Sequence, residues 1–595
     1  NLNMNNSEFI INFLQKKGLN TAFGITGGGA MFLNEAFRKQ KNLNFIFMHH
    51  EQSAAMAAEA YYRVNSKPAI LSVTSGPGGT NSVTGVIGAW IDSIPMVVIS
   101  GQVESKDMIS NSKTRQIGIQ EANIKDIIKS ITKYSNVLTK NSDIEFELSK
   151  AFKIATGGRP GPVWIDVPLD VQSKKFVKKK INKKIINKDN YSEIDNSKIT
   201  KVLQMLKISK RPLILVGNGV HISKAEKEFL NFLKKTNIPF VSTWNASDIV
   251  PSNHNFYFGR PGLFGNRISN FAIQSCDLLL IIGSRLSVPI TGYQMKNFSP
   301  LSKKIFVDID KKEIIKRKLK TNLQFNNDVK AFLKIFNKKI SKTVAPKKLW
   351  IEKLIKLKNY LDEDKKYKKN KNYINSFRFI NSLSAVLKGQ ENIITDMGTS
   401  FTCTMQSFKT KKNQRLFTSS GIAAMGFGLP GVIGAYFADK AKLPICISGD
   451  GGLMFNLQEF QTVINYKIPL KLFIINNGGY LTMKLMQQKN FKKFVGSDDK
   501  SGLTLPEFLK VAKSFGFETV KLKSENNLNK NLKNILNSKK ATVCEIITAP
   551  MQELVPRVQT QMNKDGTFQP AMLDNMYPFL GIQKVNEIRK DLLDS

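Results

Sequence analysis

Short runs of consecutive apolar residues alternate with longer amphipathic segments along most of the chain. Such runs are typical of parallel strands that helices cover on both sides, because neither face of the strand meets water. They predict strands at Thr21–Ile25, Ala69–Thr74, Met96–Ser100, Val163–Val167, Pro212–Val216, Pro239–Ser242, Leu278–Ile282, Lys304–Val307, Asn392–Thr395, Pro444–Ser448, Leu470–Ile475 and Ala541–Ile546. The pattern therefore predicts an α/β protein built from doubly wound parallel sheets.

The predicted strands fall into three groups, which are separated by segments without apolar periodicity. The groups occupy residues 4–172, 196–340 and 374–549. Residues 173–195 are rich in lysine and are predicted to be a linker, and residues 341–373 form a second, charged connection. Residues 550–595 form a tail punctuated by prolines, which we expect to pack over the other units. The sequence thus predicts three α/β domains and a C-terminal tail.

Length and composition exclude several classes of protein. A chain of 595 residues, of which 42% are hydrophobic, is too long for one small module and too apolar for a disordered protein. Its longest apolar runs, such as Leu278–Ile282, are far shorter than the roughly 18 residues that span a bilayer. The four cysteines are too far apart for a zinc motif or a disulfide framework. We expect no secretory signal, no membrane partner and a cytoplasmic location.

The net charge of +43 is unusually high and raises nucleic acid or a membrane surface as a partner. The lysines are spread over the whole chain together with many Asn and Ile residues, and no aromatic residues alternate with them as a base-stacking surface would need. We therefore expect no nucleic-acid partner. A basic binding protein without catalytic activity is the alternative from another functional class.

The clearest chemical motif lies in the third group of strands. Gly449-Asp450-Gly451 follows one predicted strand, and Asn476-Asn477 follows the next. Parallel strands would bring Asp450 and Asn477 to the same edge of one sheet. A carboxylate and an amide oxygen, with the carbonyl of Gly479 as a further oxygen, suit Mg²⁺ holding a diphosphate. Two unrelated turns are the plainer alternative.

A second candidate residue is Glu51, which begins a helix of small residues reaching to Ala60. A glutamate in the first turn of a helix is more often a surface partner of the helix dipole, so Glu51 alone indicates little. Its interpretation changes together with the diphosphate motif. The small residues predict that this helix packs tightly against another element.

Together these motifs resemble the thiamine-diphosphate enzymes, and the likeness covers nearly the whole chain. Further segments that carry it are Phe23-Gly24, Thr74–Gly78, Gly161–Val163 with Asp166–Pro168, and Gly426–Pro430. The resemblance implies three doubly wound domains of the type found in these enzymes. The domain at 4–172 would bind the pyrimidine ring, and the domain at 374–549 would bind the diphosphate.

The resemblance also implies roles for single residues. Glu51 would hydrogen-bond the aminopyrimidine ring and so promote loss of the thiazolium C2 proton. Asp450, Asn477 and the carbonyl of Gly479 would hold Mg²⁺, and Met425 would bend the cofactor. The remaining residues expected at the cofactor or the reacting centre are Gly28, Pro77, Gln120, Gly449, Gly451 and Gly452. In this family the two domains pair across a subunit interface, so a homodimer would be the smallest active form.

The middle domain, at 196–340, resembles the FAD-binding domain of the acetolactate-synthase branch, in which the flavin is structural. The residues that correspond to its diphosphate and ribose contacts are Gly217, Gly219, Arg285, Asp308 and Asp310. We therefore expect FAD beside thiamine diphosphate and Mg²⁺.

Two positions depart from acetolactate synthases. The arginine that helps to recognise the second 2-keto acid is replaced by Pro289, and a tryptophan that selects the acceptor is replaced by Met486. The loop Arg115–Glu121 and the tail resemble instead the enzymes of yersiniose-type sugar synthesis. We therefore expect pyruvate as the donor and a carbonyl acceptor, namely a nucleotide-linked keto-deoxysugar. Acetolactate synthase is the main alternative, and a hydrolase of cyclic diketones is a further one.

Overall fold

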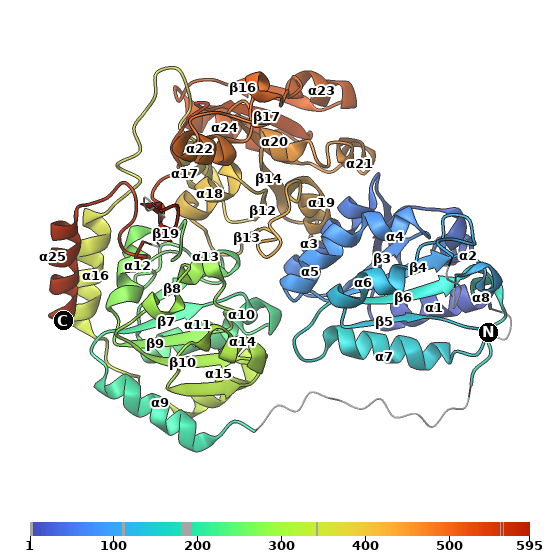
Figure 1. The fold of residues 1–595 in the computed structure, drawn as a ribbon, viewed down its shortest axis with the longest axis horizontal. Coiled ribbons are helices and arrows are strands. Elements are labelled where there is room, and N and C mark those ends of the chain that lie inside the picture. Colours follow the sequence, from blue (N-terminus) through green and yellow to red (C-terminus); the bar gives the residue numbers. More distant parts are fainter. Residues whose placement is uncertain are drawn as a thin grey trace.

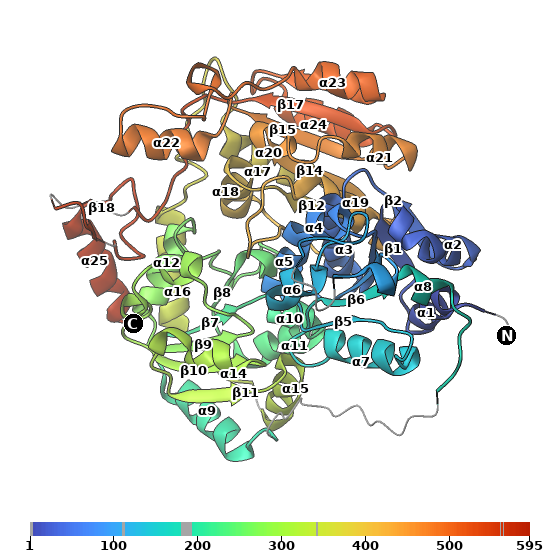
Figure 2. The same cartoon turned by 45° about the vertical axis from the view of Figure 1, so that its right-hand side comes forward.

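The computed structural model describes residues 4–109, 114–179, 193–340, 343–559, 561–562, 565–569 and 571–595. It contains three parallel sheets, each covered by helices (Figures 1 and 2). The middle of the predicted linker at 173–195 and the start of the one at 341–373 lie outside the described residues. None of the described helices is both long enough and apolar enough to cross a membrane.

The first sheet has the strand order β2-β1-β3-β4-β6-β5, and all its pairs are parallel. Its strands are β1 (Thr21–Gly24), β2 (Asn44–Phe47), β3 (Ala69–Val73), β4 (Met96–Gln102), β5 (Tyr134–Val137) and β6 (Val163–Pro168). Apolar side chains of α1 (Asn6–Lys16), α2 (Met31–Lys39) and α7 (Ile144–Thr156) form the core on one face. Those of α3 (Glu51–Asn65) and α5 (Val83–Ile91) form the core on the other.

The second sheet has five strands in the order β11-β10-β9-β7-β8. They are β7 (Pro212–Val216), β8 (Phe240–Ser242), β9 (Leu278–Ile282), β10 (Lys303–Asp308) and β11 (Leu323–Asn326). The helices α11 (Glu226–Thr236) and α15 (Val329–Lys339) contact each other over this sheet.

The third sheet repeats the plan of the first, with the order β13-β12-β14-β15-β17-β16. Its strands are β12 (Glu391–Thr395), β13 (Arg415–Phe417), β14 (Leu443–Gly449), β15 (Lys471–Asn476), β16 (Glu518–Leu522) and β17 (Thr542–Ile547). The three sheets confirm the predicted α/β fold class.

Every predicted strand is present, and the strands of the three parallel sheets that the pattern missed lie at sheet edges. They are β2, β5, β11, β13 and β16. The strand β5, for example, has four half-buried residues, and β2 exposes Asn44 and Phe47. An edge strand has a side open to water, so its sequence lacks the continuous apolar run that reveals a central strand.

The first and third domains meet through α3 and α19 (Gly428–Ala438), which cross at very short distance. A Cβ atom at Gly434 would lie 2.0 Å from the carbonyl oxygen of Ala57, so only glycine fits there. The small side chains of α3, such as Ala54 and Ala58, are fully buried in a core shared by both domains. The prediction that this helix packs tightly is confirmed.

The C-terminal tail ends in α25 (Ile582–Leu593), beside the second domain. This helix contacts α12 (Arg267–Ser275) and α16 (Lys348–Tyr360), and the three lie side by side in Figures 1 and 2. Val585, Ile588 and Leu592 are its buried residues. The helix at the end of the tail therefore contributes to the hydrophobic core that α12 and α16 also form.

A buried ionic cluster joins all three domains. Asp248 of the second domain accepts hydrogen bonds from Arg415 and from the backbone N–H of Leu416 in the third domain. The Nε2 atom of His221 lies 2.7 Å from the other oxygen of Asp248. Arg415 also donates to the carbonyl oxygen of Arg63 on α3, over 2.8 and 3.1 Å. One guanidinium thus contacts each domain.

Burial alone would raise the pKa of Asp248, but the charges of Arg415 and His221 outweigh it and lower that pKa to about 2. The ordinary value in an unfolded chain is about 3.9. The folded state therefore binds this proton less tightly than the unfolded state. Ionised Asp248 stabilises the folded chain above about pH 4, and that stabilisation is lost as the pH falls towards 2.

We predict that Asp248→Asn lowers the free energy of unfolding at pH 7 by about 3–5 kcal/mol, because it leaves the buried guanidinium of Arg415 without a counter-charge. Thermal melts at pH 7 and at pH 3 measure the effect, and the difference from wild type should be smaller at pH 3. The control is Glu507→Gln, which breaks an exposed ion pair with Lys510 and should leave the melting temperature unchanged. Equal melting temperatures for Asp248→Asn and wild type at pH 7 would contradict this account.

Candidate functional site

Asp450 and Asn477 lie at the ends of two adjacent strands. Strand β14 ends at Gly449 and pairs with β15, which ends at Asn476. One carboxylate oxygen of Asp450 accepts the backbone N–H groups of Asn477 and Gly479, each at 3.0 Å. The other accepts the N–H of Gly451 at 2.8 Å. The structure thus brings together the three predicted metal ligands.

The donor set fits a hard cation. The side-chain oxygen of Asn477 is buried and has no hydrogen-bond partner among the described residues. Burial raises the pKa of Asp450, although the N–H groups of its loop oppose that shift. A buried carboxylate beside an unpartnered amide oxygen is the environment that Mg²⁺ with a bound diphosphate would satisfy.

The neighbouring glycines divide into two kinds. A Cβ atom at Gly449 or Gly478 would meet nothing within 4 Å, so these two face open space. A Cβ atom at Gly451 would lie 2.2 Å from the ring of Tyr480, and one at Gly452 would lie 2.8 Å from the carboxylate of Asp396. Protein atoms therefore occupy the direction in which a side chain would point from Gly451 and Gly452, and the expected contact of their backbone with the cofactor stays a prediction.

Sequence reasoning missed Asp396, which holds the Met425 segment in place. This fully buried carboxylate follows β12 and accepts the N–H of Gly426 at 2.9 Å and the hydroxyl of Ser448 at 2.9 Å. Burial raises its pKa to about 6. Asp396 follows its strand just as Asp450 follows β14, which is the signal that could have revealed it.

A hydrogen-bonded asparagine connects the Met425 segment to the first domain. The amide nitrogen of Asn456 donates to the carbonyl of Gly426 at 2.7 Å, and its oxygen accepts the hydroxyl of Ser53 at 2.8 Å. Ser53 lies in the first turn of α3, two residues after Glu51. The start of the Glu51 helix and the segment carrying half-buried Met425 are therefore neighbours within one chain.

The candidate residues of the first domain gather at the carboxyl edge of its sheet. Gly28 follows β1, Glu51 follows β2, Pro77 follows β3, and Gln120 lies in the loop after β4. Since all these strands are parallel, their ends lie on one edge. This edge and that of the third domain carry all the predicted thiamine-diphosphate residues.

Glu51 is buried at the N-terminus of α3. The side-chain amide of Asn81 donates to its carboxylate at 3.0 Å, and Asn81 ends α4 (Pro77–Asn81). His50 caps the helix, because its ring Nδ1 accepts the N–H of Gln52. The plainer interpretation of Glu51 as a surface residue is wrong, since only 8% of it is exposed.

Gln120 and Arg115 are exposed on a loop. Hydrogen bonds to the buried carboxylate of Glu121 fix the backbone of this loop. The carboxylate of Glu121 accepts the N–H groups of Ile109, Ile117 and Gly118. Gln120 has a φ of +59°, and a Cβ atom at Gly76 would lie 2.2 Å from its carbonyl oxygen. The backbone of this loop at Gln120 therefore packs directly against the turn at Gly76, which precedes Pro77.

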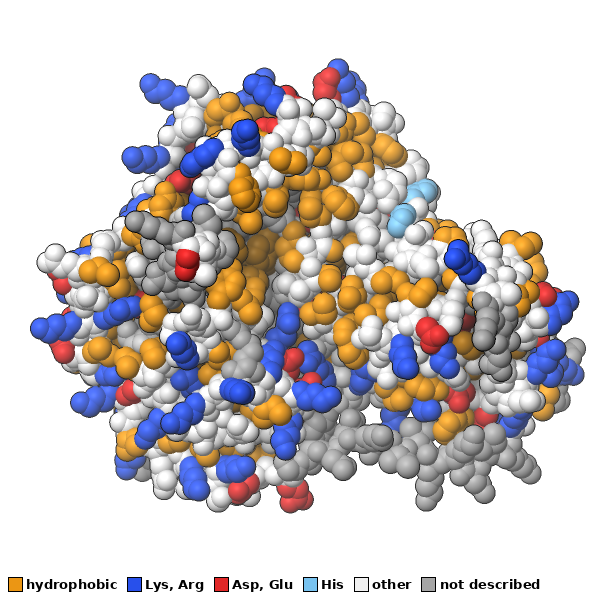
Figure 3. Space-filling model, in the orientation of Figure 1, with side chains coloured by type: hydrophobic (Ala, Val, Ile, Leu, Met, Phe, Trp, Pro, Cys, Tyr) orange, Lys and Arg blue, Asp and Glu red, His pale blue; other side chains and the backbone are white. Residues whose placement is uncertain are grey.

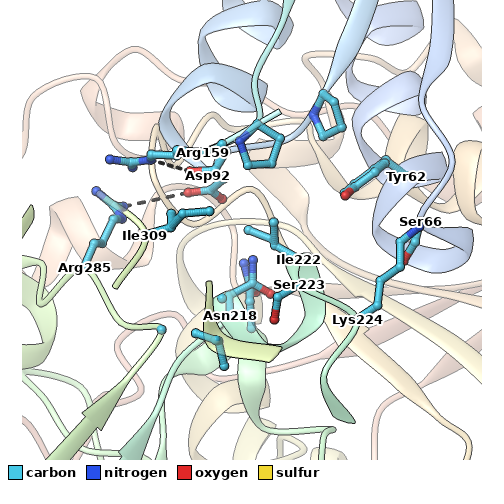
Figure 4. A pocket seen from close by; sticks show the side chains of 18 of the residues that line it. Tyr62, Ser66, Asp92, Arg159, Asn218, Ile222, Ser223, Lys224, Arg285 and Ile309 are labelled. Carbon is cyan, nitrogen blue, oxygen red and sulfur yellow. Dashed lines mark hydrogen bonds and ion pairs between the residues drawn. The ribbon is translucent and has the colours of Figure 1, made fainter. Parts of the chain in front are cut away.

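A second candidate site is a cavity of about 680 Å³ between the domains (Figure 4). Tyr62, Asp92 and Arg159 line it from the first domain, Asn218, Ser223 and Arg285 from the second, and Ser420 from the third. The guanidinium of Arg285 lies 3.8 Å from the carboxylate of Asp92. A dashed line between the two side chains marks this ion pair in Figure 4.

Three of the five residues expected at FAD line this cavity, namely Gly219, Arg285 and Asp308. Burial raises the pKa of Asp308 to about 6. Gly217 and Asp310 are not among the lining residues. A Cβ atom at Gly217 would lie 2.2 Å from the carbonyl of Gly283, and Asp310 lies 3.0 Å from the guanidinium of Arg159.

Charge and apolar surface are distributed differently. On the face shown in Figure 3, Lys and Arg side chains are scattered, whereas apolar side chains gather in the hollow where the domains meet. Exposed apolar residues also follow both metal-site motifs, with Met454 and Phe455 after Asp450 and Met483 and Met486 after Asn477. The surroundings of the site are therefore rich in apolar side chains.

Comparison with known proteins identifies all three domains. Models of the thiamine pyrophosphate enzymes match the chain over residues 4–125 (N-terminal TPP binding domain), 199–336 (central domain) and 396–546 (C-terminal TPP binding domain).

Relatives match almost end to end. A probable acetolactate synthase large subunit of Methanocaldococcus jannaschii is 31% identical over 99% of this chain and 98% of its own length. That of Methanococcus aeolicus is 32% identical over 93% of each chain. The isozyme 2 large subunit of Escherichia coli is 29% identical over 90% of this chain and 94% of its own. The chain therefore belongs to the thiamine pyrophosphate enzymes, as a carboligase of the acetolactate-synthase type.

Proposed function

We propose that this enzyme decarboxylates pyruvate and transfers the two-carbon unit to a second 2-keto acid, as an acetolactate synthase does. The observation that carries the proposal is that Asn477, whose backbone N–H donates to Asp450, has a buried side-chain oxygen without a partner among the described residues, in a chain that matches acetolactate synthase large subunits almost end to end. The relatives' names favour this acceptor over the keto-deoxysugar that the loop and tail indicated.

Thiamine diphosphate, when bound, supplies the electron sink that lets a 2-keto acid lose CO₂ and pass its remainder to a carbonyl carbon. We propose that Asp450, Asn477 and the carbonyl of Gly479 hold its diphosphate through Mg²⁺. Backbone N–H groups fix the carboxylate of Asp450 from both sides, so this ligand needs no reorganisation when the metal arrives.

Glu51 acts on the ring end of the cofactor. Its carboxylate is buried and is oriented by Asn81, so it can hold one proton on a ring nitrogen in a site with little water. Met425 provides an apolar contact for the cofactor, and Asn456 keeps the Met425 segment next to α3. The chain thus orients the cofactor from two domains.

We also propose that the cavity between the domains binds FAD as a structural group. Its volume of about 680 Å³ lies within the range of small-molecule and cofactor sites. Arg285 offers a cation to a diphosphate, and buried Asp308 offers a carboxylate that can accept hydrogen bonds from ribose hydroxyls. A flavin absorption spectrum of the purified protein tests this assignment.

A nucleotide-linked keto-deoxysugar remains the second candidate acceptor, and two observations favour it. Pro289 cannot pair with a carboxylate, and its carbonyl instead accepts the N–H of Leu263 at 2.7 Å. Met486 is 57% exposed on α22 (Leu481–Asn490), where it leaves room for a large group.

We further propose a homodimer, although a single chain already brings α3 against the third domain.

Incubation of the protein with thiamine diphosphate, Mg²⁺ and pyruvate alone separates the two acceptors. We predict rapid formation of 2-acetolactate, followed by proton NMR. Slow release of acetaldehyde or acetoin without acetolactate would contradict the acetolactate-synthase proposal and favour the sugar acceptor. Unchanged pyruvate would overturn the choice of donor.

Replacement of Glu51 by Gln should reduce pyruvate turnover by roughly 10²-fold or more, because the amide cannot hold the ring proton as a carboxylate does. The fold should persist, since Gln keeps the size of the side chain and can still accept from Asn81. Circular dichroism and the melting temperature provide that control. Near-normal turnover in Glu51→Gln would exclude the proposed role.

Replacement of Asn477 by Leu should separate metal binding from stability. It removes a buried oxygen without a partner, so the cofactor-free protein should melt at the wild-type temperature or slightly above it. The rise in melting temperature on adding Mg²⁺ and thiamine diphosphate should disappear, because ligand stabilisation depends on affinity. The role of Asn477 as a ligand is wrong if that rise persists.

A further inference from the structure

A buried lysine contacts the loop Asn477–Tyr480, which is called the metal loop below because it carries two of the three proposed Mg²⁺ ligands. This lysine has no role in the assignments above. Lys484 belongs to α22, and only 2% of it is exposed. Its ammonium donates to the backbone carbonyl of Asn477 at 3.0 Å, which is the one hydrogen bond found for it among the described residues. A lysine with so little exposure and so few partners is uncommon, because burial penalises an ammonium.

The surroundings of Lys484 carry several carboxylates. Burial lowers the pKa of Lys484, and Asp450, Asp498 and Asp499 oppose that shift through their charges. Among the described residues its ammonium forms no direct ion pair, so these carboxylates act on it over a longer distance. The ammonium therefore acts on Asp450 through space and on Asn477 through a hydrogen bond.

The loop that Lys484 contacts has little stiffness of its own. Gly478 and Gly479 follow Asn477 with φ angles of +71° and +131°, and glycine loses more conformational freedom on ordering than any other residue. Tyr480 fixes the far end, since its N–H donates to the carbonyl of Ser497 at 2.9 Å. Lys484 fixes the near end at Asn477.

We propose that Lys484 is a positioning residue for the metal–diphosphate site, which holds the loop of Asn477 and Gly479 in its binding conformation and adds a fixed positive charge beneath it. Both effects favour binding of the diphosphate together with Mg²⁺, because that pair carries net negative charge. For Mg²⁺ alone the two effects oppose each other. Affinity for the cofactor in saturating Mg²⁺ is therefore the quantity to measure.

Isothermal titration calorimetry with thiamine diphosphate in millimolar Mg²⁺ tests the proposal, which rests on the proposed metal–diphosphate site. Lys484→Met should raise the Kd by about tenfold or more, the range expected for loss of a charge-assisted hydrogen bond. Lys484→Arg keeps the charge and the donors and should stay within about threefold of wild type. Lys484→Gln keeps a donor without the charge and should lie between them.

Lys471 supplies a matched control. It is also buried, it donates to the carbonyl of Lys540 and the hydroxyl of Thr542, and it begins the strand β15 that leads to the metal loop. It therefore lies at the opposite edge of the sheet from Asn477. Lys471→Met should lower the melting temperature and leave the Kd for thiamine diphosphate unchanged.

Hydrogen exchange gives a readout that does not need the cofactor. The N–H groups of Asn477 and Gly479 are bonded to Asp450, so they should exchange slowly in the cofactor-free wild type. Lys484→Met should speed their exchange, whereas Lys471→Met should not. This measurement also decides the matter if Lys484→Met is less stable.

The outcomes separate two failures. Absence of thiamine diphosphate binding by the wild type would overturn the proposed site itself. Equal Kd values for wild type and Lys484→Met, with unchanged exchange at the metal loop, would overturn only the role of Lys484. A lower melting temperature alone would then mark Lys484 as an ordinary part of the core.

Discussion

The close crossing of α3 and α19 is the constraint on which the site depends. Gly434 lies against the carbonyl of Ala57 with no room for a Cβ atom, and the alanines of α3 are buried in a core common to both domains. That contact fixes the direction in which α3 begins, and Glu51 is its first residue. A larger residue on either helix would separate the carboxyl edges of the first and third sheets, which carry the residues that we propose bind the ring and the diphosphate. The small residues of α3 therefore serve the chemistry indirectly.

Buried charge is handled in two ways in this molecule. At the junction of the domains, Asp248 has Arg415 and His221 as partners, and its pKa is low. At the metal loop, Asp450 has only backbone N–H groups and a more distant ammonium, and its pKa is raised. The first arrangement is electrostatically complete in the folded chain and holds domains together. The second leaves the carboxylate without a counter-charge in direct contact, which fits the cation site that we propose there. The Lys and Arg side chains on the face shown in Figure 3 are scattered over it and do not gather at either place.

The central strands, the domain pattern and the main site motifs could be read from the sequence. Continuous apolar runs mark strands that are buried on both faces, and a Gly-Asp or Asn-Asn pair after such a run marks the sheet edge where ligands bind. The edge strands β2, β5, β11 and β16 were missed because several of their residues are partly or fully exposed, and β13 was missed because it is only three residues long. Glu51 was recognised only together with the diphosphate motif, because one glutamate in a first turn has no distinctive pattern.

The rest was decided by contacts between residues far apart in the chain. Asp396 meets Gly426, Asn456 bridges Gly426 to Ser53, and Lys484 reaches back to the carbonyl of Asn477. The sequence did not reveal that Tyr480 and Asp396 pack against Gly451 and Gly452, or that Arg159 pairs with Asp310. By itself the sequence determined which residues end the parallel strands, because apolar periodicity is local. Only the tertiary structure decided which of those residues have partners within the protein and which are left without one, because partnership depends on packing between domains.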